Sequence, residues 1–213
     1  TLNNAVPHIL LVITGSIAAC KIPEIIRLFR DRGCKVTATM TQSAEAFITP
    51  LTVASLTENP VYSELFSLKD ETEMGHIRLS REANLVLVAP ASANTLAHMA
   101  HGIAENLAHT ILLATDKPVA VAPAMNVRMW EHPANQRNIE LLQKDGITII
   151  GPESGTLACG ETGAGRMSEP EHIVEVALNQ LQRSQALAGK KAIVTSGPTV
   201  SYTHLRAHET RPY

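Results

Sequence analysis

The segment GTLACGETGAGRM, residues Gly155–Met167, places four glycines around one cysteine. Glycine loses more backbone freedom on folding than any other residue, so a glycine-dense segment makes a poor helix or strand. A loop of this composition is typical of a functional segment. Cys159 is its candidate reactive group.

Three other segments of small polar residues follow short apolar runs: Thr14–Cys20, Pro90–Thr95 and Pro123–Asn126. In the first, TGSIAAC, a Gly-Ser turn leads into a helical pattern, so its N–H groups either bind a phosphate or serve only the helix cap. In the second, PASANT, the polar side chains either contact a planar ligand or cap the next helix. In the third, PAMN, Asn126 can bind a substrate carboxylate, although spacing alone favours an N-cap.

Histidine is the other candidate for acid–base chemistry. His76 lies in EMGHI, before a candidate helix, and a lone histidine is more often structural than catalytic. His98 and His101 have the spacing of two ligands on a helix, but no cysteine or acidic cluster accompanies them. No metal is therefore predicted.

The apolar pattern predicts the elements that position these loops. Short runs typical of buried strands occupy residues 8–14, 34–40, 84–90, 118–124, 147–150 and 191–196. Helical candidates occupy about 22–33, 92–104, 106–115, 134–145 and 170–183, the last with Ser168 and Glu171 at capping-box spacing. This alternation predicts an α/β fold, a doubly wound, Rossmann-like or flavodoxin-like open parallel sheet with helices on both faces. Residues 42–82 show no clear pattern.

Composition narrows the classes of function. A net charge of −2 over 213 residues gives no reason to expect nucleic acid or a membrane as partner. No apolar run approaches the ~18 residues of a membrane span, and the first residues lack a secretory signal, so we expect a cytoplasmic protein. Three cysteines without Cys-x-x-Cys spacing argue against a disulfide framework. A small-molecule ligand is therefore expected.

The order and spacing of GSIAA, GHI, PAMN and ACGETGAGRM resemble those of the flavin-dependent cysteine decarboxylases. The resemblance covers about residues 7–199. It is greatest to the decarboxylase half of the bacterial bifunctional phosphopantothenoylcysteine decarboxylase / phosphopantothenate-cysteine ligase. It implies an FMN-binding decarboxylase domain at 1–186, then a linker and truncated start of a ligase domain at 187–200. The acidic ligase segment does not follow, so we expect no ligase activity and a non-native or disordered tail at 201–213.

The resemblance also implies roles for individual residues. FMN would be bound by Gly15, Ser16, Ile17, Thr41, Ser43, Ser92 and Asn94. The catalytic residues would be His76, Asn126 as carboxylate contact and Cys159 as proton donor. The glycine-rich loop would be a flexible clamp over the substrate, whose further contacts would be Met125, Ala158, Gly160, Gly165, Arg166 and Met167. Cys20 departs from the tyrosine common in bacterial relatives and has no expected role.

The implied reaction converts 4'-phospho-N-pantothenoylcysteine to 4'-phosphopantetheine in coenzyme A biosynthesis. Direct loss of CO2 would leave a carbanion without an electron sink. Oxidation of the CH2–SH group by flavin gives a thioaldehyde β to the carboxylate, so CO2 loss yields an enethiolate. Reduced flavin and an acid then complete the product.

Two other activities are compatible with the same fold. A flavin prenyltransferase shares the FMN site, and a catalytically idle FMN-binding regulatory subunit shares the fold. The joint presence of His76, Asn126 and Cys159 weighs against both. Self-association as a trimer or dodecamer is a further implication of the resemblance.

Overall fold

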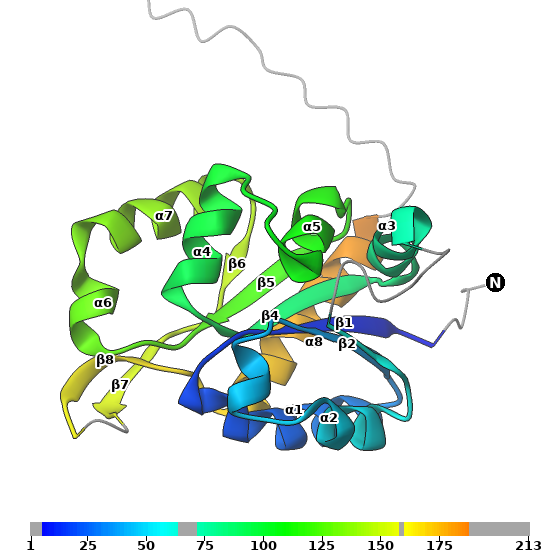
Figure 1. The fold of residues 1–213 in the computed structure, drawn as a ribbon, viewed down its shortest axis with the longest axis horizontal. Helices are drawn as coiled ribbons and strands as arrows, with labels where there is room; N and C mark the ends of the chain where they lie inside the picture. Colours follow the sequence, from blue (N-terminus) through cyan, green and yellow to red (C-terminus); the bar gives the residue numbers. More distant parts are fainter. Residues whose placement is uncertain (1–5, 64–71, 158–159, 188–213) are drawn as a thin grey trace, which may run out of the picture.

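A six-stranded parallel sheet forms the centre of the computed structural model, which describes residues 6–63, 72–157 and 160–187, with side chains omitted at 72–76 and 184–187. The strand order is β3-β2-β1-β4-β5-β6 (Figure 1). The strands are β1 His8–Ile13, β2 Lys35–Met40, β3 Val61–Tyr62, β4 Leu85–Ala91, β5 Val119–Pro123 and β6 Thr148–Ile149. This is the strand order of the doubly wound dinucleotide-binding fold.

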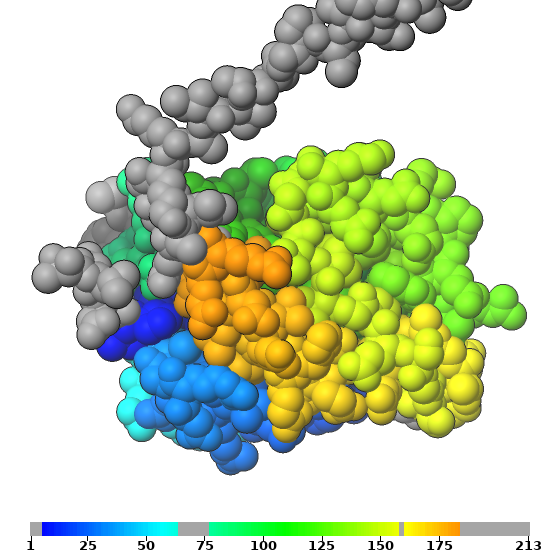
Figure 2. All heavy atoms as spheres, turned by 180° about the vertical axis from the view of Figure 1, so that it is seen from behind, coloured from blue at the N-terminus to red at the C-terminus, as the bar shows by residue number. Residues whose placement is uncertain are grey.

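Helices cover both faces of the sheet, as the sequence predicts. Successive strand side chains point to opposite faces, and Ile9 and Leu11 of β1 pack in one core while Leu10 and Val12 pack in the other. The first core is covered by α1 Ile22–Asp31, α2 Pro50–Thr57 and α8 Pro170–Leu187. The second is covered by α3 Thr72–Glu82, α4 Ala93–His101, α5 Leu107–Ala114 and α7 Pro133–Lys144. Figure 2 shows α8 in orange across the rear face.

The helix α1 illustrates how the sequence sets this packing. Ile22, Ile25, Ile26 and Phe29 recur at helical spacing, and all four are buried against the sheet. Burial of each such side chain contributes about 1.5–3 kcal/mol. Gly33 follows the helix with φ +75°, a left-handed conformation that L side chains rarely adopt. The helix therefore ends where the sequence predicts.

Residues 42–82 contain elements for which the sequence showed no clear pattern. They include the 3-10 turn η2 Ala44–Ala46, α2, the edge strand β3 and α3. Because α3 begins at Thr72, His76 lies within this helix, and the prediction that it precedes one is wrong. The strand β3 has two residues, too few for a periodic signal.

The glycine-rich segment is also more regular than predicted. Strands β7 Glu153–Thr156 and β8 Thr162–Arg166 form an antiparallel hairpin, so most of the segment is strand and not loop. Gly163 at φ +157° and Gly165 at φ +135° supply backbone conformations that other residues rarely adopt. Glycine here permits a strand that must approach its neighbours closely.

The predicted capping box at the start of α8 is wrong. The helix begins at Pro170, one residue later than that motif requires, because proline favours the first helical position. Ser168 is fully buried beneath Gly151, and its hydroxyl has no hydrogen-bond partner among the described residues. The predicted strand at 191–196 and the tail at 201–213 lie outside the described residues. Within the described part, no helix is long and apolar enough to cross a bilayer.

Candidate active site

The loops after β1 and β4 meet where the strand order reverses direction, the position at which open α/β sheets bind ligands. Thr14, which is 1% exposed, joins the two loops. Its hydroxyl donates to the Pro90 carbonyl at 2.6 Å and accepts from the Ser92 N–H at 3.0 Å. These bonds fix Gly15 and Ser16 relative to the start of α4.

The loop after β2 joins the same cluster through Gly15. A Cβ at Gly15 would lie 2.6 Å from Ser43 Oγ, so only glycine allows this approach. Ser43 Oγ in turn lies 3.1 Å from Thr41 Oγ1. The structure thus brings Gly15, Thr41 and Ser43 together, as a shared ligand requires.

Two of the predicted ligand residues also cap helices. Ser16 Oγ accepts from the Ala18 N–H at 3.2 Å at the start of the 3-10 turn η1, Ile17–Lys21. Ser92 Oγ accepts from the Thr95 N–H at 3.3 Å at the start of α4. The capping interpretation is therefore confirmed for both, and each oxygen still has a lone pair for a ligand. Asn94 in the first turn of α4 is exposed.

Asn126 is the N-cap of the short helix α6, Val127–Glu131. Its Oδ1 accepts from the Met129 N–H at 2.8 Å, which confirms the cap. This bond uses the oxygen of the side-chain amide and turns Nδ2 away from the helix. Asn126 therefore presents a hydrogen-bond donor to its surroundings.

A cavity of about 380 Å³ joins the turn after β1, the segment after β5 and the hairpin. Seven predicted site residues line it: Ser16, Ile17, Met125, Asn126, Gly165, Arg166 and Met167. The cavity lining does not include Gly15, Thr41, Ser43, Ser92, Asn94 or Gly160. The side chain of His76 and residues Ala158 and Cys159 lie outside the described part of the chain.

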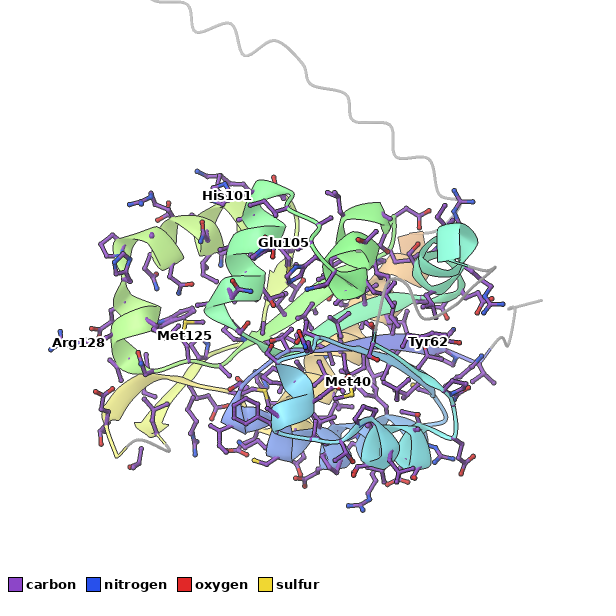
Figure 3. All side chains as sticks on the ribbon, viewed as in Figure 1. Met40, Tyr62, His101, Glu105, Met125 and Arg128 are labelled. Atoms are coloured by element: carbon purple, nitrogen blue, oxygen red, sulfur yellow. The ribbon has the colours of Figure 1, made fainter. Side chains whose placement is uncertain are left out.

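The hairpin reaches the cavity by packing on the segment before α6. The Met125 N–H donates to the Gly165 carbonyl at 3.0 Å, and a Cβ on Gly165 would overlap the Met125 carbonyl. Gly163 packs against Val127 in the same way. Figure 3 shows Met125 beside α6. The glycines therefore let β8 form one wall of the cavity.

Charged side chains connect this wall to η1. Lys21 Nζ lies 2.8 Å from Glu169 Oε2, and Arg166 Nη2 lies 3.3 Å from Glu169 Oε1 and 3.2 Å from Glu153 Oε2. The hydrogen bond from Lys21 holds the pKa of Glu169 below its usual range, and the charges of Lys21 and Arg166 add to this shift. Both cations line the cavity. No group of three histidine, cysteine or carboxylate residues in the described part could hold a metal ion.

The flavoprotein family model, described as "Flavoprotein", matches residues 2–182. The chain belongs to this flavoprotein family. The flavoprotein is 45% identical over 191 residues to the coenzyme A biosynthesis bifunctional protein CoaBC of Escherichia coli, covering 90% of this chain and 47% of the relative. It is 42% identical over 200 residues to the CoaBC protein of Bacillus subtilis, covering 93% and 49%. The chain thus spans about half the length of these curated relatives.

Solved structures agree with the fold of the flavoprotein. A PPC decarboxylase mutant complexed with pantothenoylaminoethenethiol is 34% identical with a TM-score of 0.76, covering 84% of this chain and all of that chain. The FMN-dependent cysteine decarboxylase SpaF is 29% identical with a TM-score of 0.71, covering 83% and 97%.

The residues of the flavoprotein fit a flavin nucleotide. Gly15 leaves no Cβ between the loops after β1 and β2, and Ser16 and Ser92 hold hydroxyl groups at the ends of adjacent strands. Hydroxyl and backbone N–H groups at this edge suit a phosphate and a polyol. The cavity volume is also within the roughly 300–1,000 Å³ typical of small-molecule sites.

Sequence reasoning missed two charged residues of the flavoprotein site, Lys21 and Glu169. Lys21 follows the segment TGSIAAC directly, and its place in the turn was a signal that it could reach the ligand edge. Glu169 precedes a helix and resembles an ordinary acidic residue near a helix start. Their pairing spans 148 positions, so no local pattern predicts it.

Proposed function

We propose that this flavoprotein decarboxylates 4'-phospho-N-pantothenoylcysteine to 4'-phosphopantetheine with FMN, through a domain of about residues 1–186. One observation carries the proposal: the turn at Ser16, Asn126 and the hairpin that flanks Cys159 in sequence border the same cavity. The printed names of the relatives support this reading, because they include coenzyme A biosynthesis proteins and a PPC decarboxylase.

The cofactor would be held by the three loops at the carboxyl ends of β1, β2 and β4. The residues proposed to contact FMN are Gly15, Ser16, Ile17, Thr41, Ser43, Ser92 and Asn94. Bound FMN would supply a reversible two-electron oxidation of the substrate CH2–SH group. The hydrogen bonds of Thr14 with Pro90 and Ser92 would hold the loops after β1 and β4 in fixed relative positions before any ligand binds.

Asn126 would orient the substrate carboxylate. Because its Oδ1 is held by the Met129 N–H, its Nδ2 remains as a donor, which suits a carboxylate acceptor. A fixed donor positions the carboxylate without rearrangement and so favours the reactive geometry. Met125 and the hairpin residues Gly165, Arg166 and Met167 would contact the rest of the substrate.

Cys159 would donate the proton to the enethiolate after CO2 leaves. Its loop has fixed ends, because the Leu157 N–H donates to the Glu161 carbonyl at 2.8 Å and the Gly160 N–H donates to the Leu157 carbonyl at 2.9 Å. Leu157 also lines the cavity. Ala158 and Gly160 would contact substrate beside this thiol, and His76 would act as base or electrostatic partner in the earlier steps.

The first experiment supplies FMN-loaded protein with 4'-phospho-N-pantothenoylcysteine and follows the product by mass spectrometry. Loss of CO2 to give 4'-phosphopantetheine is expected, and Cys159→Ser should retain CO2 loss and accumulate the enethiol. Unchanged substrate beside intact bound FMN contradicts the proposal and favours the prenyltransferase or the idle regulatory subunit. A native mass measurement tests the accompanying proposal of a trimer or dodecamer.

A further inference from the structure

A histidine that none of the roles above uses lies buried behind the loop after β4. His109 on α5 is 3% exposed, and its ring stacks on His98 of α4 with centroids 4.4 Å apart and planes at 21°. Its Nδ1 is buried without a hydrogen-bond partner in the described part of the chain. Burial of an unpaired polar atom is unfavourable, so the position of this ring calls for an explanation.

Hydrogen bonds connect His109 to the proposed flavin site. His109 Nε2 lies 3.4 Å from Thr95 Oγ1, and the Ser92 hydroxyl donates to the same Thr95 oxygen at 3.2 Å. The Thr95 N–H returns a bond to Ser92 Oγ at 3.3 Å. Thr95 is 1% exposed, so solvent does not compete for its hydroxyl group. The chain of contacts therefore runs from His109 through Thr95 to Ser92.

The protonation state of His109 determines which atoms donate and which accept in the contacts from His109 through Thr95 to Ser92. Burial lowers the pKa of His109, and the nearby His98 lowers it further, while Glu105 raises it less. Figure 3 shows Glu105 near the junction of α4 and α5. The ring is therefore neutral near pH 7 and has one acceptor nitrogen.

The direction of the Ser92–Thr95 bond then indicates which atom accepts. Ser92 donates its only hydroxyl hydrogen to Thr95, so Thr95 must direct its own hydroxyl hydrogen elsewhere. His109 Nε2 is its neighbour at 3.4 Å, so we assign the ring hydrogen to Nδ1, the buried atom that has no partner in the described part of the chain. With its hydrogen committed to Thr95, Ser92 Oγ offers a ligand only a lone pair.

We infer that His109 is a positioning residue for the flavin site, because its Nε2 accepts from Thr95 and thereby fixes Ser92 Oγ as an acceptor for a hydroxyl or N–H donor of the cofactor. The inference rests on the proposed contact between Ser92 and FMN. In this inference His109, which lies behind the loop after β4, determines that the Ser92 hydroxyl group acts as an acceptor toward the cofactor.

The test uses FMN titration of apoprotein, followed by flavin fluorescence and absorbance. His109→Leu removes the acceptor, and Thr95→Val removes the hydroxyl at nearly constant volume. Each should raise the Kd for FMN about 3- to 10-fold, the effect of one hydrogen bond. The double variant should lose no more than the weaker-binding single variant, because both changes interrupt one chain. His109→Gln, whose amide oxygen can accept from Thr95, should recover part of the affinity.

His98→Leu is the matched control, since it removes the stacked ring and leaves the Ser92–Thr95–His109 bonds in place. It should leave the Kd for FMN within twofold of the parent. Parent-like affinity in both folded His109→Leu and Thr95→Val, or multiplied losses in the double variant, would overturn the inference. If His109→Leu does not fold, Thr95→Val and His109→Gln decide it. Absence of FMN binding by the parent protein would overturn the proposed cofactor as well.

Discussion

Lys21 Nζ lies 2.8 Å from Glu169 Oε2, so an ion pair joins the turn after β1 to the residue before α8 across 148 positions of the chain. Glu169 also lies 3.3 Å from Arg166 Nη2, and one carboxylate thus contacts two cations of the cavity wall. The pair holds the hairpin end of the site against η1. The side chain of Glu169 is 46% exposed, so a substitution there changes the ion pair without disturbing the core.

Glu169→Gln should lower the free energy of unfolding by less than about 1 kcal/mol at pH 7, since exposed ion pairs are weak. The pKa of Glu169 is lowered, chiefly by the Lys21 hydrogen bond, so its contribution is present at neutral pH and is lost as pH falls through that lowered pKa. Urea unfolding of parent and variant at neutral and acid pH measures this. Glu175→Gln, an exposed change on α8, is the control. A difference that grows in acid contradicts the prediction.

Asn126→Asp should distinguish the role of Asn126 as the N-cap of α6 from its proposed role in binding the substrate carboxylate. Aspartate retains the oxygen that accepts the Met129 N–H, so the free energy of unfolding should change by less than about 0.5 kcal/mol. It replaces the Nδ2 donor with a carboxylate oxygen that repels the substrate carboxylate, so kcat/KM should fall at least about 100-fold. Steady-state kinetics and urea unfolding measure the two effects. Parent-like turnover in the aspartate variant would remove Asn126 from the proposed site.

The fold follows from the sequence because its central strands are continuous apolar runs and its helices carry regular apolar stripes. The six-residue strand β1 and the helix α1 both show these signals. The short elements do not: β3 has two residues and α6 has five, and tertiary contacts place both. The hairpin escaped prediction because glycine is rare in strands, whereas here Gly163 and Gly165 permit close approach to Val127 and Met125.

The site was predicted loop by loop, but the contacts between loops were not. The approach of Gly15 to Ser43 and the two bonds of Thr14 join residues that are far apart in sequence. Motif order identified which loops carry polar side chains. Only the three-dimensional arrangement separates the residues that line the cavity, such as Asn126, from those that do not, such as Ser92.

Gly165→Ala should detach the hairpin from the segment before α6. Its Cβ would overlap the Met125 carbonyl at a backbone φ of +135°, so a loss of about 1–3 kcal/mol in local stability is expected. Hydrogen exchange of the Met125 N–H, which donates to Gly165, reports the loss directly. Gly160→Ala is the control, since φ is +82° there but, apart from its chain neighbours, no atom of the described residues lies within 4 Å of the added Cβ. Equal exchange in the two variants would show that the close contact is unimportant.

Buried histidines should make the protein less stable in mild acid. Burial lowers the pKa of His8, which is 6% exposed, and of His109, which is 3% exposed. Above pH 6.5, the ordinary pKa of histidine, both rings are neutral in the folded and in the unfolded protein. Below that pH the unfolded protein takes up protons on these rings that the folded protein does not. The free energy of unfolding should therefore fall as pH drops from about 7 to about 5, by at most about 1.4 kcal/mol per pH unit for each histidine.

The His109→Leu variant isolates one of these two contributions. It removes one of the titrating groups, so the slope of stability against pH over this range should be smaller than in the parent, whatever the change in absolute stability. His172→Leu, an exposed change on α8, is the control and should keep the parent slope. Urea unfolding at closely spaced pH values measures all three slopes. A parent-like slope in His109→Leu would mean that this ring is protonated equally in the folded and unfolded states.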